Sequence, residues 1–276
     1  MKKRLFSAAV VAILCTACKK DTPEPTERMF SSMIDETAVE SISVRGYNKL
    51  KMPVLLSTLN KDLEYNAVPV YENGRLTQVF GGRPRYDNYL TNVYKYNDVG
   101  QAFRVDLYSS GIIDRYDSLA YDNNGHLATI YHKKLSYSVD YPFGIYKKDV
   151  FVWDTTGNIT QLHTVQIKNG QESKDTTTTS YTYDDKINFM GKPAELFMLN
   201  YENGITWLSA NNMLTQVTVY PTGDSVKSVT NVYTYDSENY PVTVKVNKRT
   251  TQGGAILSDR TADFKINYER IPITDK

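Results

Sequence analysis

The decapeptide WDTTGNITQL, at 153–162, is the fullest copy of a pattern that recurs along the chain. The pattern is an aromatic residue, then Asp or Asn, two variable positions, Gly, a polar residue and an apolar residue. Further copies begin at Tyr71, Tyr96, Tyr121 and Tyr235. Their spacing leaves room for two strands and two turns in each unit, so the sequence predicts consecutive β-hairpins.

The Gly of each copy is expected to close a hairpin turn. Asp154 suits the first position of a type I turn, and Gly157 suits the left-handed position that follows it. A residue with a Cβ at that position costs about 1 kcal/mol or more. In the last copy Asn239 takes this place. The turn glycines are Gly74, Gly100, Gly125 and Gly157. Gly74 stands one residue earlier than the others, which predicts a tighter turn.

Large apolar or aromatic residues precede each turn in pairs, two positions apart. The pairs are Tyr94/Tyr96, Leu119/Tyr121, Phe151/Trp153, Tyr181/Tyr183 and Tyr233/Tyr235. Residues two apart share one face of a strand, so these pairs predict a stripe of rings across the sheet. After the turn, apolar residues stand three apart, as at Ile159 and Leu162. Residues three apart lie on opposite faces of a regular strand, or on the same face if a β-bulge lies between them. The fold class is therefore all-β, an antiparallel up-and-down meander of repeated hairpins.

The first 30 residues differ from the rest. Residues 1–17 have a charged start and a short apolar core, which predicts a signal peptide. Cys18 follows small residues, as the acylated cysteine of a bacterial lipobox does. We therefore expect Cys18 to carry lipid chains, palmitate among them, that hold the protein to the outer membrane, facing either the periplasm or the cell surface. Residues 18–30 are interpreted as this cysteine and a flexible tether, and 31–276 as a single β-repeat domain.

The repeat copies resemble the YD repeats of RHS-type proteins, most closely at 121–130 and 153–162. From Tyr65 to Tyr268 the chain is more similar to a Bacteroidota family of lipoproteins with a porin-like fold. In that family a lipobox precedes "YxYD" strands, and a segment matched here by 183–189, without its Pro, precedes a block matched by 199–214. The resemblance implies a strongly curved or barrel-like sheet and no activity. Within this region, 192–199 is the one segment expected to form a short helix.

No motif predicts a catalytic, metal or cofactor site. His126, His132 and His163 lack metal-ligand spacing, so each is interpreted as a polar strand residue. The formal net charge is +1 and no basic stripe is present, which disfavours nucleic acid as a partner. Trp207 stands outside the repeats and is the candidate for ligand contact. Both cysteines lie in the first 18 residues, so the β domain has no disulfide.

Three functions remain for such a chain. The favoured one is a non-enzymatic, lipid-anchored envelope protein that binds a glycan or a protein partner. The alternative is a secreted hydrolase with its site in the groove of the curved sheet. An integral outer-membrane barrel is disfavoured, because the strands carry Lys and Asp without a continuous apolar band. The ligand, the oligomeric state and closure of the sheet stay open.

Overall fold

The computed structural model describes residues 26–37, 39–84, 88–135, 143–191, 195–221 and 223–273. These residues form sixteen strands: β1 (Thr26–Asp35), β2 (Glu40–Val44), β3 (Leu56–Asn60), β4 (Leu63–Glu72), β5 (Arg75–Gly82), β6 (Tyr89–Tyr96), β7 (Ala102–Ser109), β8 (Ile112–Tyr121), β9 (Leu127–Leu135), β10 (Phe143–Trp153), β11 (Ile159–Lys168), β12 (Gln171–Ile187), β13 (Asn211–Val219), β14 (Ser225–Tyr235), β15 (Pro241–Gln252) and β16 (Ala255–Pro272).

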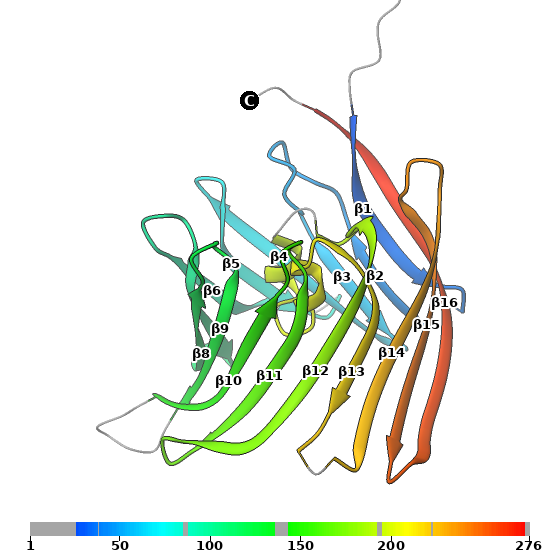
Figure 1. Cartoon of the computed structure of the whole chain (residues 1–276). Coiled ribbons are helices and arrows are strands. Elements are labelled where there is room, and N and C mark those ends of the chain that lie inside the picture. Colours follow the sequence, from blue (N-terminus) through cyan, green and yellow to red (C-terminus); the bar gives the residue numbers. More distant parts are fainter. Residues whose placement is uncertain are drawn as a thin grey trace, which may run out of the picture.

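The strands form one closed barrel in which each strand pairs antiparallel with its sequence neighbours (Figure 1). β1 pairs with β16 and completes the ring. This confirms the predicted meander, and it settles the closure that the sequence left open. One end of the barrel, here called the repeat-turn end, holds the turns of the repeated pattern. Thr26 and Pro272 pair at this end, and the opposite end is called the return end.

The repeat turns have the predicted backbone. Gly100, Gly125 and Gly157 have φ of +87°, +83° and +86°. Asn73 and Gly74 both have positive φ, which is the tighter two-residue turn expected there. The carboxylate oxygen Oδ1 of Asp154 accepts hydrogen bonds from the backbone N–H groups of Thr156 and Asn158, both at 2.9 Å. A side chain that satisfies two turn amides explains the acidic position of the repeat.

A β-bulge explains the three-residue spacing after each turn. Trp153 pairs with Ile159 but Val152 pairs with Gln161, so Thr160 is the extra residue. Ile159 and Leu162 are consequently both buried in the barrel. The Thr160 hydroxyl donates a 3.2 Å hydrogen bond to the Val152 carbonyl across the bulge. The same register shift follows the turns of the other copies, so the bulge is part of the repeat.

Aromatic residues near the ends of the strands that run toward the repeat-turn end, here called the anchor rings, form a ladder of hydrogen bonds from one hairpin to the preceding one. Five rings donate to the carbonyl of the residue two positions after a turn Gly or Asn, and we call this set the ring-to-carbonyl ladder. Its members are Tyr96 to Leu76 (2.7 Å), Tyr121 to Ala102 (2.8 Å), Trp153 to Leu127 (2.9 Å), Tyr183 to Ile159 (2.8 Å) and Tyr268 to Pro241 (2.8 Å). Tyr235 is an exception, because its hydroxyl donates to the Asp184 carboxylate. Burial raises the pKa of Tyr121 and of Tyr183 to about 12, so these hydroxyls remain donors at neutral pH.

The first strand begins inside the segment expected to be tether. Residues 26–30 belong to β1, and Phe30 is buried in the core. The prediction of a flexible tether up to residue 30 is therefore wrong for these five positions. Met29 and Phe30 are apolar, as expected for a buried strand, but the prolines and charged residues near them indicated a tether.

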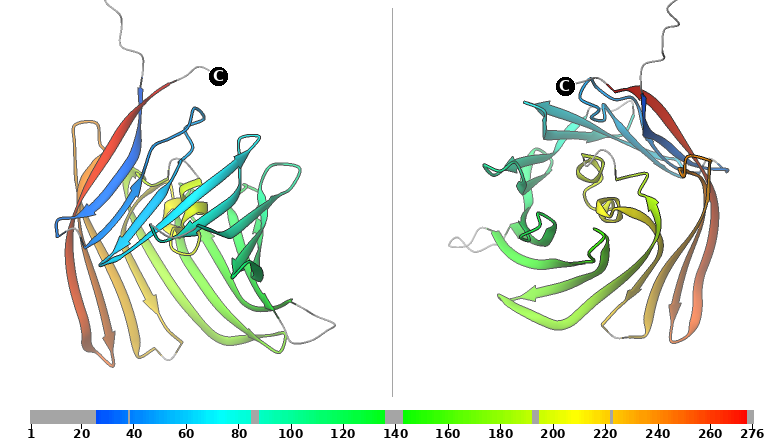
Figure 2. Two further views of the ribbon diagram at one scale, coloured as in Figure 1. Left: turned by 180° about the vertical axis from the view of Figure 1, so that it is seen from behind. Right: turned by 45° about the horizontal axis from the view of Figure 1, so that its top comes forward.

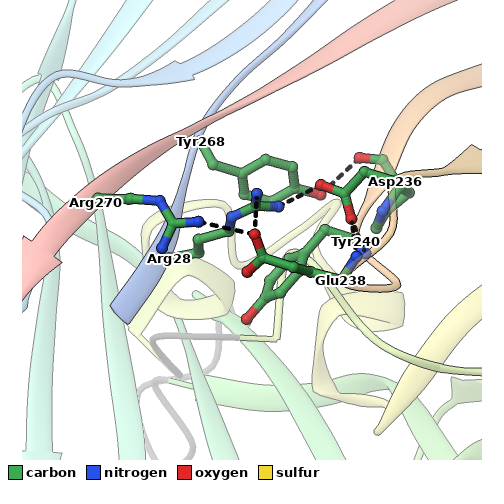
Figure 3. Close-up of polar contacts among 7 residues, drawn as sticks. Arg28, Asp236, Glu238, Tyr240, Tyr268 and Arg270 are labelled. Carbon is green, nitrogen blue, oxygen red and sulfur yellow. Dashed lines mark hydrogen bonds and ion pairs between the residues drawn. The ribbon is translucent and has the colours of Figure 1, made fainter. Parts of the chain in front are cut away.

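A charged cluster fastens this strand to the end of the chain (Figure 3). The Arg28 guanidinium forms ion pairs with Asp236 and, at 2.8 Å, with Glu238. Arg270 on β16 reaches the same Glu238 carboxylate at 2.9 Å. The Arg28 guanidinium also lies 4.9 Å from the centre of the Tyr240 ring. These contacts tie β1, β16 and the β14–β15 turn together at the point where the barrel closes.

The outward face of the barrel carries ion pairs midway along its strands. Lys245 alternates with buried Val244 and Val246, and its Nζ lies 3.6 Å from Asp263. Asp106 lies between buried Val105 and Leu107. Its carboxylate pairs with Lys95 on β6 at 3.0 Å and with Arg104 at 2.5 Å. Charged side chains midway along a lipid-facing band are costly, by about 2–4 kcal/mol for Lys or Arg.

A segment between β12 and β13 folds into the barrel, and we call it the plug. It is described for 188–191 and 195–210, and it contains α1 (Glu195–Leu199) and the 3₁₀ helix η1 (Ile205–Leu208). The right view of Figure 2 shows it surrounded by the strands. Leu196 and Phe197 are buried, and the Tyr94 hydroxyl donates a 2.6 Å hydrogen bond to the Met198 carbonyl. The expected short helix is confirmed over 195–199, while 192–194 lie outside the described residues.

Candidate functional site

The plug fills part of the barrel and leaves cavities between itself and the wall. Three of them have linings different enough to predict different ligands. We call them the polar cavity, the apolar mouth cavity and the Trp207 cavity.

The polar cavity has a volume of about 580 Å³ and reaches toward the return end. Its wall residues come from β3, β4, β6, β7 and β8, and its floor from plug residues 199–203. Hydroxyl, amide and charged groups dominate the lining. They are Thr58, Thr91, Asn92, Ser109, Asp114, Arg115, Asn200, Glu202 and Asn203, together with Tyr65, Tyr108 and Tyr201. The Arg115–Glu202 ion pair joins the wall to the plug.

A glycine in β5 makes room for one ring of this cavity. A Cβ on Gly81 would lie 1.8 Å from the Tyr65 hydroxyl oxygen and 2.8 Å from the Thr91 methyl carbon. Glycine within a strand commonly marks such a close approach. Gly81 therefore sets the position of Tyr65 against the barrel wall.

The apolar mouth cavity, of about 440 Å³, lies at the repeat-turn end. The anchor rings Tyr96, Tyr121 and Trp153 line it, with the turn glycines at 100, 125 and 157 and with plug residues Phe197, Met198 and Leu208. The His126 ring stacks on Trp153, with 4.7 Å between ring centres and an angle of 18°. The polar atoms of the three anchor rings are engaged in the ladder, so the rings present carbon to this cavity.

Trp207 lies in η1, half-buried against the core, and lines the third cavity of about 320 Å³. Apolar residues of β1, β2 and β13–β15 form the opposite wall, among them Met33, Ile42 and Val244. The indole is therefore directed into the barrel rather than outward. Its role as a ligand contact stays a prediction.

A buried charged group joins three neighbouring strands inside the barrel. His132 on β9 lies between two carboxylates, with Nδ1 2.9 Å from Asp117 Oδ1 and Nε2 2.8 Å from Asp149 Oδ2. Lys147 Nζ lies 3.2 Å from Asp149, and the Thr164 hydroxyl donates to the same carboxylate at 2.6 Å. Because both ring nitrogens face carboxylates, the arrangement favours the imidazolium form, in which both nitrogens donate.

The pKa values follow from opposing effects. Burial lowers the pKa of His132, but the hydrogen bonds to Asp117 and Asp149 outweigh it, and the net pKa is raised. Burial raises the pKa of Asp149, but the bonds from His132 and the charge of Lys147 outweigh it, and the net pKa is lowered. Tyr201 of the plug is buried beside Asp117, and burial raises its pKa strongly.

This group is structural rather than catalytic in geometry. All three side chains are buried, and none of them lines the three cavities. A general acid or base must reach the proton that it transfers. Within the described ranges, no set of three His, Cys, Asp or Glu side chains is arranged to hold a metal ion.

The predicted site residues fall in separate places. Gly74, Gly100, Gly125 and Gly157 lie in the repeat turns, three of them on the apolar mouth cavity. Cys18 lies outside the described residues. The polar cavity and the His132 group were missed, because their residues come from strands far apart in sequence. Asp117 on β8 and Asp149 on β10 flank β9, and neither stands in a local motif.

The fold and interior define a closed, plugged, sixteen-stranded antiparallel barrel. It is similar to the crystal structure of a porin-like protein from Bacteroides uniformis ATCC 8492, with 15% identity over 87% of this chain and 96% of that chain and a TM-score of 0.53. A porin-like protein from Bacteroides vulgatus ATCC 8482 has 14% identity, coverage of 87% and 99%, and a TM-score of 0.43. The first of these likenesses shows a porin-like fold.

Comparison of the sequence itself gave no relatives. No family model matches the chain, and no curated protein matches it. The resemblance to lipoproteins and to YD repeats therefore stays a prediction. Among the described residues, no helix has the length and apolar character to cross a bilayer.

We predict that His132 titrates above about 6.5, the usual value of a histidine. A raised folded-state pKa stabilises the fold below the unfolded pKa, and this contribution is lost as pH rises through the folded pKa. An NMR titration of the imidazole resonances measures it, with His126→Gln and His163→Gln assigning the other two rings. A His132 pKa below that of an unfolded histidine would contradict the two-carboxylate geometry.

Proposed function

We propose that the protein is a non-enzymatic, lipid-anchored binding protein of the cell envelope, and that the polar cavity binds a glycan. The lining of that cavity is the observation that carries the proposal. Its hydroxyl, amide and guanidinium groups can donate and accept hydrogen bonds with sugar hydroxyls. Tyr65 adds ring surface against which a sugar face can pack. Its volume lies in the range of small-ligand sites.

The hydrolase alternative rests on two carboxylates of the same cavity, Asp114 and Glu202. A glycosidase requires one carboxyl group that stays protonated and a second that acts as base or nucleophile. Glu202 is held in an ion pair with Arg115, and its side chain is 57% exposed. The general acid of a glycosidase lies in an apolar pocket, whereas Glu202 lies beside a guanidinium and is open to solvent. The binding function is therefore favoured.

The outward face supports attachment through a lipid rather than through the barrel wall. Ion pairs such as Lys245–Asp263 lie on the outside, midway along the strands. The first described residue, Thr26, lies at the repeat-turn end. A chain reaches at most about 3.6 Å per residue, so an anchor at Cys18 would hold this end near the membrane and leave the return end, with the polar cavity, directed away from it.

Glycan binding is tested by titrating the chain from residue 19 with a panel of envelope and dietary polysaccharides, using calorimetry. We expect Tyr65→Ala to weaken binding of the ligand found about fivefold, because a packed ring contributes about 1 kcal/mol. Tyr131→Ala, on the outward face of β9, is the matched control and should bind as the unmodified chain does. Absence of binding across the panel, or equal loss in both variants, would contradict the proposal.

Turnover separates the alternatives. We expect the bound glycan to remain intact after prolonged incubation. Chromatography that detects newly formed reducing ends measures any cleavage. Release of fragments that stops in Glu202→Gln would instead establish the hydrolase.

Anchoring is tested by expressing Cys18→Ser beside the unmodified chain. We expect the unmodified chain to incorporate labelled palmitate and sediment with membranes after carbonate extraction. The Cys18→Ser chain should incorporate none and remain in the supernatant, because the barrel exterior carries charges. Retention of Cys18→Ser in the membrane after carbonate treatment would show that the barrel itself is embedded.

A further inference from the structure

A cationic group lies next to the apolar mouth cavity, in an adjoining hollow lined by Glu72, Asn73, Arg75, Thr77 and Tyr96. Arg75 follows the Asn73–Gly74 turn, and its guanidinium lies against Gly100, where a Cβ would be 2.9 Å from Nη2. The guanidinium carbon lies 5.7 Å from the centre of the Tyr96 ring. Both Gly100 and Tyr96 also line the cavity. In the described part of the chain Arg75 makes this cation–π contact and no ion pair.

The cavity beside this cation is lined mainly by carbon, and its polar side chains are Gln101 and His126. Leu76, Leu127, Phe197, Met198 and Leu208 contribute aliphatic and aromatic surface, and the three anchor rings have their polar atoms bonded to carbonyls. Burial of apolar ligand surface is the main favourable interaction that such a lining offers. A sugar would leave most of its hydroxyls without partners here, which costs free energy.

We propose that this cavity binds a single-chain anionic amphiphile, a fatty acid, with its hydrocarbon tail among the anchor rings and its carboxylate at Arg75. A planar guanidinium matches a carboxylate through two parallel hydrogen bonds. The exposed position of Arg75 keeps the charged head in contact with water while the tail is enclosed. The inference concerns a different cavity from the glycan site and does not depend on it.

The ligand would sit directly on the repeat. The turn glycines form part of the lining because they carry no side chain, and the bulges bring both Leu76 and the following Val79 inward. The same features that close the hairpins therefore leave an apolar hollow at the mouth.

Trp153 is a built-in probe of this cavity. The chain has two tryptophans, so Trp207→Phe leaves Trp153 as the single reporter. In this background we would titrate the full-length chain without its leader, from residue 19, with laurate below its micelle concentration. Dodecanol and dodecyltrimethylammonium, which share the twelve-carbon tail, serve as the neutral and cationic ligands. A bromine-substituted laurate then tests contact through quenching of Trp153 fluorescence.

We expect laurate to bind and to quench when brominated, and dodecyltrimethylammonium to bind about tenfold more weakly, as loss of one charge-assisted pair predicts. Arg75→Gln should abolish the preference for laurate over dodecanol. Ala210→Phe, which places a ring into the mouth from an exposed position on its lining, should weaken all three ligands. Ala120→Phe, exposed on the outward face of β8, is the control for added ring surface.

Several results would overturn the proposal. Equal affinity of the three ligands would remove the role of Arg75, and equal affinity of Ala210→Phe and Ala120→Phe would place the ligand elsewhere. Quenching only by brominated diacyl lipid vesicles would assign this end to a membrane surface instead. The circular dichroism spectrum and the melting temperature of each variant show whether the barrel is folded. Binding is compared only among variants that are folded.

Discussion

The hydrogen bond from an anchor ring to the carbonyl beyond the preceding turn is the contact on which this barrel depends. Each copy joins a strand to the hairpin before it, and the carbonyl it satisfies lies beside a buried apolar side chain such as Leu76 or Ile159. A buried carbonyl without a donor costs about 1–3 kcal/mol. The ring also packs inward, so one side chain both donates to the carbonyl after the turn and covers the turn. The same hydrogen bond recurs from hairpin to hairpin around the barrel. The last one joins Tyr268 to the Pro241 carbonyl, beside the pair β1–β16 that closes the barrel.

A ring of sixteen strands is too wide for wall side chains to meet at its centre. The plug supplies the missing core through Leu196, Phe197 and Tyr201, and it is fixed by polar contacts as well. The Asn188 side chain donates to the carbonyls of Thr206 (3.0 Å) and Ser209 (2.9 Å) and holds the loop in a compact form. The plug fills only part of the barrel interior. A polar cavity therefore remains on one side of it, and an apolar cavity remains at the mouth. Different binding chemistries thus arise within one barrel.

The repeat made much of the fold predictable. Asp154 and Gly157 specify a turn through local backbone preferences, and rings two apart specify a face, so neither depends on distant residues. The bulge at Thr160 was not decidable, because a spacing of three fits two geometries until the partner strand is known. Closure depended on β1, whose Phe30 stands among residues that otherwise suggest a tether.

The contacts inside the barrel could not be predicted from local sequence patterns, because they also depend on strand register. Asp117, His132 and Asp149 occupy ordinary alternating positions on three strands, and only the register brings them together. The plug has no period that would reveal its inward course, and the polar cavity combines it with five strands. Trp207 was singled out as a ligand contact by its place outside the repeats, and the sequence did not show that the plug directs it into the barrel. Arg75 became notable only once Gly100 and Tyr96 were seen beside it.

The free energy of unfolding of Tyr121→Phe, measured by urea denaturation, tests the ladder most directly. The change removes the hydroxyl that bonds to the Ala102 carbonyl and leaves the ring in place. Tyr131→Phe, on the outward face of the next strand, is the matched control. The ladder predicts a loss of about 1–2 kcal/mol for Tyr121→Phe and less than about 0.5 kcal/mol for Tyr131→Phe. Equal small losses in the two variants would contradict the account.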